Sequence, residues 1–192
     1  MPDFEKVELM LKNVRISFPH LFRRPVFRDG PGKFGGTLLL NKKEHAALIK
    51  KVDAEIKKLC KKSFGKDLAP DKVCMRDGDF SRDEYEGHMY LTTNSKGKPC
   101  VFAADGKSEI QNEDDCKIYA GCRVNAKIEL WVQDSKDNGK RINGAMIAVQ
   151  FAGDDETLDG STIDPEKAAE GFEDVGDYDK ADDSWMDDEI PF

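Results

Sequence analysis

The sequence predicts a mainly β protein with one principal helix, folded as a small, partly closed barrel and followed by an acidic tail. Three observations support this fold class. About six segments alternate as strands do, and one longer segment repeats apolar residues at helical spacing. The charge balance then changes abruptly near residue 153, where the apolar segments end.

The first strand is expected over residues 7–18, which alternate imperfectly and end at Pro19. A loop rich in Arg, Pro, Gly and Phe follows over residues 20–33. The second strand is expected over residues 34–40. Its two consecutive glycines indicate a bulge or a sharp bend.

The principal helix is expected over residues 41–64. Asn41 is suited to cap its N-terminus, with Glu44 three residues later, and Gly65 supplies a stop. One apolar face recurs at near-helical spacing and is formed by Leu48, Val52, Ile56, Leu59 and Phe64. The lysines lie largely off this face, which indicates a solvated outer side.

The remaining strands follow an irregular, charged segment at residues 66–87. Residues 88–93 and 99–103 are expected to be two strands joined by a turn. Residues 123–132 alternate well and are expected to form a hairpin with residues 141–151. Curved strands, glycine bulges and turns fit the barrel that binds oligonucleotides and oligosaccharides, the OB-fold. A β-sandwich is the alternative.

The tail begins at residue 154 and differs from the body in charge. Residues 1–153 hold 28 Lys and Arg against 22 Asp and Glu, a balance of +6. Residues 154–192 hold 2 Lys against 16 acidic residues, a balance of −14. The tail has too little apolar surface to offset the entropy of ordering and is expected to be disordered. The net charge of −8 therefore does not exclude nucleic-acid binding by residues 1–153.

The sequence gives no sign of export or of a membrane span. The N-terminus lacks the apolar core of a secretory signal, and no apolar run approaches about 20 residues. The cysteines are five in number and irregularly spaced, which favours free thiols in a reducing cytoplasm.

The chain ends in a short motif of acidic and apolar residues: Asp187, Asp188, Glu189, Ile190, Pro191 and Phe192. This tip resembles the terminus of bacterial single-stranded DNA-binding proteins, with one Asp replaced by Glu. The resemblance implies that Phe192 enters an apolar pocket on a partner protein while the carboxylates engage a basic rim. An aromatic anchor, a terminal charge and a stiff Pro on a tail suit recruitment physically. The alternative is a solvating tail whose last residues are accidental.

The whole chain resembles a family of phage-encoded single-stranded DNA-binding proteins, formerly catalogued as a domain of unknown function. The resemblance rests on residues 11–19, on residues 38–42 before the helix and on the acidic tail. It implies an OB-fold that binds single-stranded DNA without strong sequence preference. Neither an enzymatic activity nor a cofactor or metal is then expected.

Proteins that bind single strands combine a basic groove with aromatic rings on which bases stack. The best candidate is the loop at residues 18–28, which interleaves aromatic and basic side chains: Phe22, Arg23, Arg24, Phe27 and Arg28. The alternative is that its phenylalanines close one end of the barrel.

Trp131 is the second candidate, because it shares the polar side of its strand with Arg123 and Lys127. The alternative for Trp131 is a contact with the tail or with a second copy. Three weaker candidates extend the proposed track: Tyr90, Lys140 and Arg141.

These observations predict a protein that protects single-stranded DNA in phage replication, recombination or repair and recruits partner proteins through its tip. Two rivals stay open. One is a metal-dependent nuclease that uses the carboxylates between Asp77 and Glu86, and the other is an adaptor that binds no DNA. The pattern does not separate a monomer from a homodimer.

Overall fold

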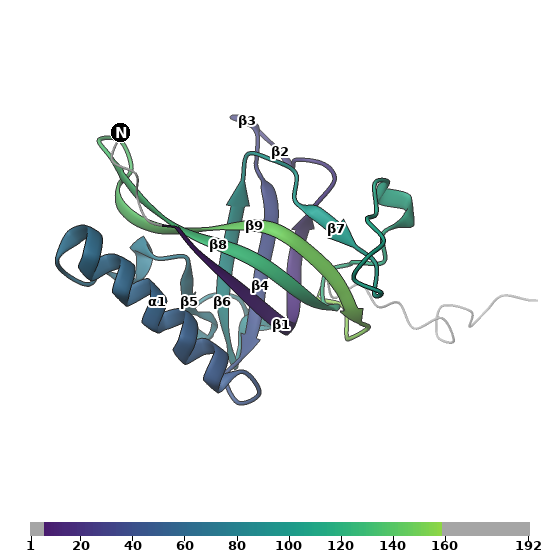
Figure 1. The fold of residues 1–192 in the computed structure, drawn as a ribbon, viewed down its shortest axis with the longest axis horizontal. Coiled ribbons are helices and arrows are strands. Elements are labelled where there is room, and N and C mark those ends of the chain that lie inside the picture. The colour runs from purple at the N-terminus through teal and green to yellow at the C-terminus, as the bar shows by residue number, and fades with distance from the viewer. Residues whose placement is uncertain (1–5, 159–192) are drawn as a thin grey trace, which may run out of the picture. The chain divides into compact units, whose positions relative to one another are not determined.

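The computed structural model describes residues 6–158, which form a closed mixed β-barrel with one α-helix (Figure 1). The predicted tip at residues 187–192, and all of the predicted tail beyond residue 158, lie outside the described residues. The strands are β1 (Lys6–His20), β2 (Val26–Phe27), β3 (Gly30–Pro31), β4 (Phe34–Asn41), β5 (Met75–Asp77), β6 (His88–Ser95), β7 (Cys100–Phe102), β8 (Arg123–Ser135) and β9 (Gly139–Gly153). The helix is α1 (Ala46–Phe64).

The barrel closes through five strands in the order β1, β4, β6, β9 and β8. β1 pairs antiparallel with β4 and with β8, β4 pairs with β6, and β8 pairs with β9. A parallel contact between Thr93 of β6 and Gly144 of β9 closes the circle. This arrangement confirms the predicted barrel with an inserted helix, and the β-sandwich alternative is wrong.

The strands form where the sequence alternates. Along β8, buried and half-buried residues follow one another at every step from Arg123 to Gln133. β1 is longer than predicted and bends at two register shifts, one between Leu11 and Val14 and one between Ser17 and His20. Such bends allow a single strand to pair with β8 over its first half and with β4 over its second.

The helix begins later than predicted, at Ala46. The Asn41 side chain accepts hydrogen bonds from the backbone N–H groups of Lys43 and Glu44, so it caps the turn that precedes the helix. The helix ends at Phe64, and Gly65 follows in the left-handed conformation (φ 71°), as predicted.

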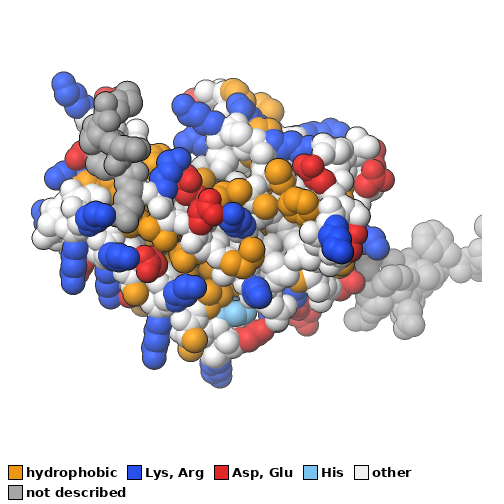
Figure 2. All heavy atoms as spheres, viewed as in Figure 1, with side chains coloured by type: hydrophobic (Ala, Val, Ile, Leu, Met, Phe, Trp, Pro, Cys, Tyr) orange, Lys and Arg blue, Asp and Glu red, His pale blue; other side chains and the backbone are white. Residues whose placement is uncertain are grey.

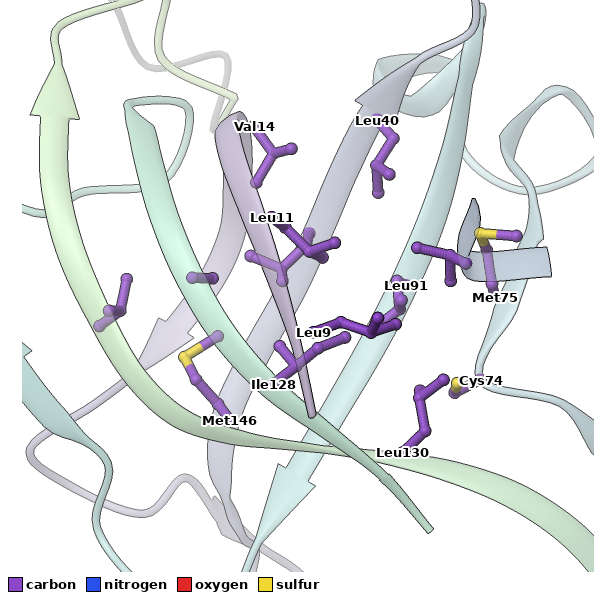
Figure 3. Packing of buried hydrophobic residues seen from close by; sticks show 14 of the residues in the cluster. Leu9, Leu11, Val14, Leu40, Cys74, Met75, Leu91, Ile128, Leu130 and Met146 are labelled. Carbon is purple, nitrogen blue, oxygen red and sulfur yellow. The ribbon is translucent and has the colours of Figure 1, made fainter. Parts of the chain in front are cut away.

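The core fills the barrel (Figure 3). The same cluster of buried residues includes side chains of α1. Leu11, Leu91 and Ile128 are fully buried inside the barrel, whereas Val52 and Leu59 extend the same cluster from α1. The helix therefore covers one end of the barrel with its predicted apolar face. This burial is the main source of stability for the fold.

The five cysteines are free thiols, and three of them are buried. Burial raises the pKa of the Cys74 thiol to about 12, so this thiol stays protonated and unreactive at neutral pH. Within residues 6–158, no helix combines the length and apolar character that a membrane span requires.

Candidate nucleic-acid interface

Two neighbouring hollows lie on the outer surface of the barrel. The first has a volume of about 320 Å³ and is lined from β1, β4, β6 and two loops by Phe18, His20, Pro25, Phe27, Lys33, Gly35, Gly36, Thr37, Arg82, Thr92, Thr93 and Asn94. The second has a volume of about 520 Å³ and is lined by Lys33, Asn94, Ser95, Lys96, Gly97, Lys98, Glu129, Trp131, Ala145, Met146 and Ile147. Lys33 and Asn94 line both hollows, which together form one path lined by residues of the five barrel strands. We call this path the groove.

The floor of the groove is built from small side chains. Gly35 has φ 140°, and a Cβ atom there would lie 2.1 Å from the carbonyl oxygen of Thr93, so only glycine fits. Thr37, Thr92 and Ala145 continue the outward-facing positions on β4, β6 and β9. A flat floor of this kind allows a planar group to approach the sheet closely.

The rim of the groove is basic. Lys33, Lys96 and Lys98 are exposed, and the carboxylate of Glu129 is paired with Lys6 Nζ at 3.1 Å. The Arg24 guanidinium lies 5.0 Å from the centre of the Phe34 ring and donates to the carbonyl oxygen of Lys96 at 2.6 Å. These contacts tie the loop at residues 21–33 to the turn after β6, so the loop forms one wall of the groove.

The structure places two of the predicted aromatic residues in the groove. Phe27 is 62% exposed, and its ring lies against Gly32 and beside Pro25 in the first hollow. Trp131 is half-buried and lines the second hollow. Both rings therefore face a surface that a single strand can reach, although the role of each in stacking stays a prediction.

Other predicted residues of the loop and of β6 lie beside the groove. Phe22 is half-buried, packs against the core, and has Lys98 Nζ 4.4 Å from its ring centre. Arg23 pairs with Glu113 at 2.6 Å, and Arg28 is exposed in the turn between β2 and β3. The Tyr90 ring lies 5.5 Å from that of Tyr85, under the segment at residues 78–87.

Three predicted basic residues are engaged away from the groove. Lys127 pairs with Glu8 at 2.7 Å and lines a separate hollow beside Met10. Lys140 Nζ lies 5.1 Å from the centre of the Phe64 ring, at the end of α1. Arg141 donates to backbone oxygens of Asn138 and Asp71. The structure does not bring these residues together with Phe27 and Trp131.

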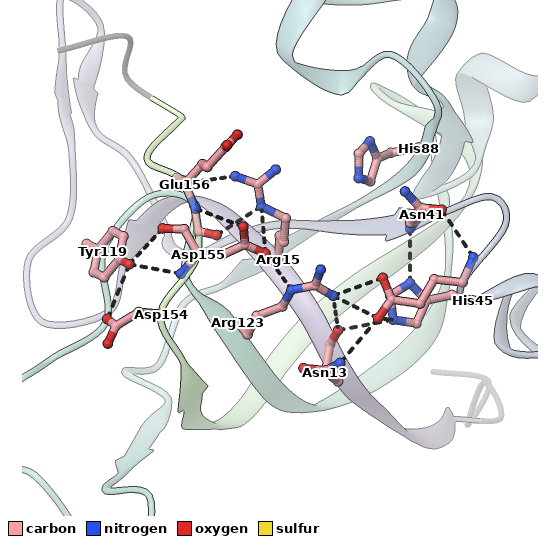
Figure 4. A network of polar contacts seen from close by, with 12 residues as sticks. Asn13, Arg15, Asn41, His45, His88, Tyr119, Arg123, Asp154, Asp155 and Glu156 are labelled. Atoms are coloured by element: carbon pink, nitrogen blue, oxygen red, sulfur yellow. Dashed lines mark hydrogen bonds and ion pairs between the residues drawn. The ribbon is translucent and has the colours of Figure 1, made fainter. Parts of the chain in front are cut away.

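Arg123 belongs to a polar network that fastens residues 154–158 to the barrel (Figure 4). Its guanidinium contacts Asp155 at 2.6 Å and Glu44 at 2.9 Å. Burial disfavours its charge, but the hydrogen bonds to Asp155 and Glu44 outweigh burial and raise the pKa of Arg123. The Arg15 guanidinium donates to the Glu156 carbonyl oxygen. Residues 154–158, assigned above to the tail, therefore pack on the barrel, and we call them the tail root.

Arg123 and Trp131 lie on the same side of β8 but have different surroundings. The two residues are eight positions apart on a strand that curves around the barrel. Arg123 is opposite Gly153, next to the tail root, whereas Trp131 is opposite Asn143, near the hairpin end of the strand. The alternation of a sequence predicts which face of the sheet a residue occupies. It does not predict which part of the barrel surface the residue reaches, because the strand curves.

Sequence reasoning did not single out five residues that line the groove: Phe18, Lys33, Arg82, Lys96 and Lys98. Phe18 ends the predicted first strand and begins the candidate loop at residues 18–28, but Phe22 and Phe27 were chosen there as the stacking rings. Arg82 lies in the irregular segment at residues 66–87, which has no periodicity to place it. The only signal for them in the sequence is an aromatic and four basic residues close to glycines or prolines, a pattern that is too common to indicate a binding site.

The carboxylates that suggested a nuclease are held by a lysine. Lys42 Nζ lies 2.6 Å from an oxygen of Asp77 and 2.5 Å from one of Asp79. The hydrogen bond from Lys42, with a second from the Gly87 N–H group, lowers the pKa of Asp79. Among residues 6–158 no group of three or more His, Cys, Asp or Glu side chains is arranged to hold a metal ion.

Comparison with known proteins gives consistent matches over most of the chain. The family model described as the single-stranded DNA-binding protein of Enterobacter phage Enc34 matches residues 7–185. Putative protein p50 of Acyrthosiphon pisum secondary endosymbiont phage 1 is 31% identical over 181 residues, which cover 88% of this chain and 94% of that protein.

Solved structures agree with the sequence matches. The single-stranded DNA-binding protein from bacteriophage Enc34 superposes with a TM-score of 0.70 at 30% identity, covering 84% of this chain and 89% of that one. The same phage protein in complex with single-stranded DNA also gives a TM-score of 0.70, at 32% identity over 79% of this chain and 89% of that one.

Proposed function

Because the chain belongs to the family of the Enterobacter phage Enc34 single-stranded DNA-binding protein, we propose that it binds and protects single-stranded DNA in phage replication, recombination or repair. The observation that carries the proposal is the groove, in which Phe27 and Trp131 line a small-residue floor beneath a basic rim. The family consists of binding proteins rather than enzymes, which agrees with the absence of catalysis expected from the sequence.

The groove supports binding without sequence preference. Stacking on aromatic rings tolerates every base, because each base has a π-face. Lys33, Lys96 and Lys98 offer point charges that suit phosphates, which carry no sequence information. The floor residues Gly35, Thr37 and Ala145 are short, so they leave room for bases of either size.

The acidic tail has two proposed roles. The tip at residues 187–192 recruits replication, recombination or repair proteins through Phe192 and its neighbouring carboxylates. The rest of the tail competes with DNA for the basic groove, because residues 159–192 hold 13 acidic residues against 2 Lys and are tethered to the same chain.

The tail root supports this competition geometrically. Leu158 N–H donates to the Ala120 carbonyl oxygen, and the neighbouring Gly121 N–H donates to the carbonyl oxygen of Ile16. Ile16 is two residues before Phe18, which lines the first hollow. Leu158, the last described residue, therefore lies next to the segment that pairs with β1 shortly before Phe18. We propose that the protein acts in the cytoplasm of a bacterial host, as a monomer or a homodimer.

Binding of fluorescent oligonucleotides tests the proposal directly. We expect the full chain to bind single strands of different sequence with similar affinity and to bind a duplex of the same length at least tenfold more weakly. The affinity should fall steeply with salt, because phosphate contacts release counterions. Equal binding to duplex would contradict the proposal, and no binding to either would favour the adaptor.

A further inference from the structure

From the surroundings of Phe18 we infer a base-stacking position that the sequence did not single out, in which the Phe18 ring carries a base and Arg82 holds the adjoining phosphate. This inference rests on the proposed function, since it assigns residues to the same groove. Four observations support it: the backbone of Phe18, the exposure of its ring, the free donors of Arg82, and the anchoring of the segment that carries Arg82.

Phe18 has an unusual backbone conformation for a phenylalanine. Its φ is 49°, in the left-handed region that favours glycine, and it lies in the irregular part of β1 between Ser17 and His20. The side chain is 47% exposed, so burial does not compensate for this conformation. The strained backbone turns a large ring outward into the first hollow, and such outliers are concentrated at functional sites.

Arg82 faces this ring with its hydrogen-bond donors available. The guanidinium carbon lies 4.9 Å from the centre of the Phe18 ring. Within residues 6–158 no carboxylate forms an ion pair with Arg82, although Asp83 and Glu84 follow it in the sequence. A planar guanidinium over one face of the ring can donate from its edge to a phosphate while the opposite face of the ring stacks on the attached base.

The segment at residues 78–87 is pinned beside Phe18, which fixes Arg82 in place. The hydroxyl of buried Tyr85 donates to Ser17 Oγ at 3.1 Å, and Ser17 is the direct neighbour of Phe18. The other end of the segment is held by Lys42, which follows β4: its backbone N–H donates to the Gly87 carbonyl oxygen at 2.9 Å, and its Nζ lies 2.5 Å from the Asp79 carboxylate. Ring and guanidinium therefore come from two anchored segments, which reduces the entropy lost on binding.

Phe18→Ala, Phe18→Gly and Arg82→Gln test the inference in the full-length chain. The probes are a thymidine oligonucleotide and an abasic strand of equal length. Phe18→Ala is expected to weaken binding of the thymidine strand by about tenfold and to affect the abasic strand little, because only the former offers bases to stack. Arg82→Gln should lower the slope of log affinity against log salt by about 0.7, the value for one phosphate of a single strand.

Two controls separate stacking from a structural role. Phe18→Gly relieves the left-handed backbone, so it should unfold at a temperature no lower than Phe18→Ala while binding DNA as weakly. Phe80→Ala removes a phenylalanine that is 90% exposed on the segment of Arg82 but does not line the groove, and it should bind like the wild type. The inference would be overturned if Phe18→Ala lost affinity equally for the thymidine and abasic strands, or if it bound both as tightly as the unmodified protein does. In either case, single-stranded DNA binding by the unmodified protein would still support the proposed function.

Discussion

Replacing both Lys33 and Lys96 with Glu is expected to weaken single-stranded DNA binding by about two orders of magnitude at about 0.1 M salt. Lys33 lines both hollows of the groove, and Lys96 lines the second. Both side chains are exposed, so their replacement leaves the core of the barrel unchanged. The double change removes two phosphate contacts and adds repulsion at the same places. The slope of log affinity against log salt should fall by about 1.4.

The matched control changes two lysines of α1 instead. Lys51 and Lys61 are exposed on the helix, and Lys51→Glu with Lys61→Glu alters the net charge by the same amount. Figures 1 and 2 show basic side chains along the edge of the molecule where α1 lies, away from the loop that carries β2 and β3. This control should retain near wild-type affinity. Equal losses in both variants would mean that overall charge, rather than the groove, governs binding.

Deleting residues 159–192 is expected to tighten single-stranded DNA binding by about tenfold at low salt and to have little effect at high salt. The deletion removes 13 acidic residues and 2 Lys, the segment that we propose competes with DNA for the groove. The cut follows Leu158 because Asp155 and Glu156 hold the tail root against Arg123 and Arg15. Titration of a labelled oligonucleotide at several salt concentrations measures the effect.

Phe192→Ala separates the two proposed roles of the tail. It keeps every tail carboxylate, so DNA binding should equal that of the wild type, whereas binding to purified host replication and repair proteins should fall at least tenfold. Neutralising the tail carboxylates at constant length should reproduce the effect of the deletion on DNA binding. If the truncated chain bound DNA as tightly as the full chain or more weakly, the proposal that the tail competes with DNA would be wrong.

The sequence predicted the barrel well because its strands keep a simple period. Residues 123–132 alternate without interruption. The double glycine after Phe34 predicted a bulge or bend in β4, but β4 keeps an unbroken register with β6 and the irregularity lies on the facing part of β1, between Ser17 and His20. The start of α1 was misplaced because Asn41 caps a turn with the same bonds that it would use to cap a helix. The residues around Asn41 therefore could not show whether it caps a turn or the first turn of a helix.

The groove was only partly predictable, for a different reason. Phe27 and Trp131 stood out as aromatic residues in polar surroundings, and the structure places both in the groove. Arg123 stood out in the same way but is held by Asp155 and Glu44, 32 and 79 positions away in the sequence. Phe18 and Arg82 meet only because the segment at residues 78–87 folds back onto β1. Contacts of this kind depend on the closed barrel, which no local pattern contains.

Photo-crosslinking of an iododeoxyuridine oligonucleotide, followed by mass spectrometry of the peptides, tests most directly that single-stranded DNA lies in the groove. Cross-links are predicted at the aromatic residues that line it, Phe18, Phe27 and Trp131. The hollow lined by Met10, Phe102 and Lys127 lies elsewhere on the barrel surface and should give none. Cross-links confined to that hollow, or to Lys140 and Arg141 beside α1, would contradict the assignment of the groove.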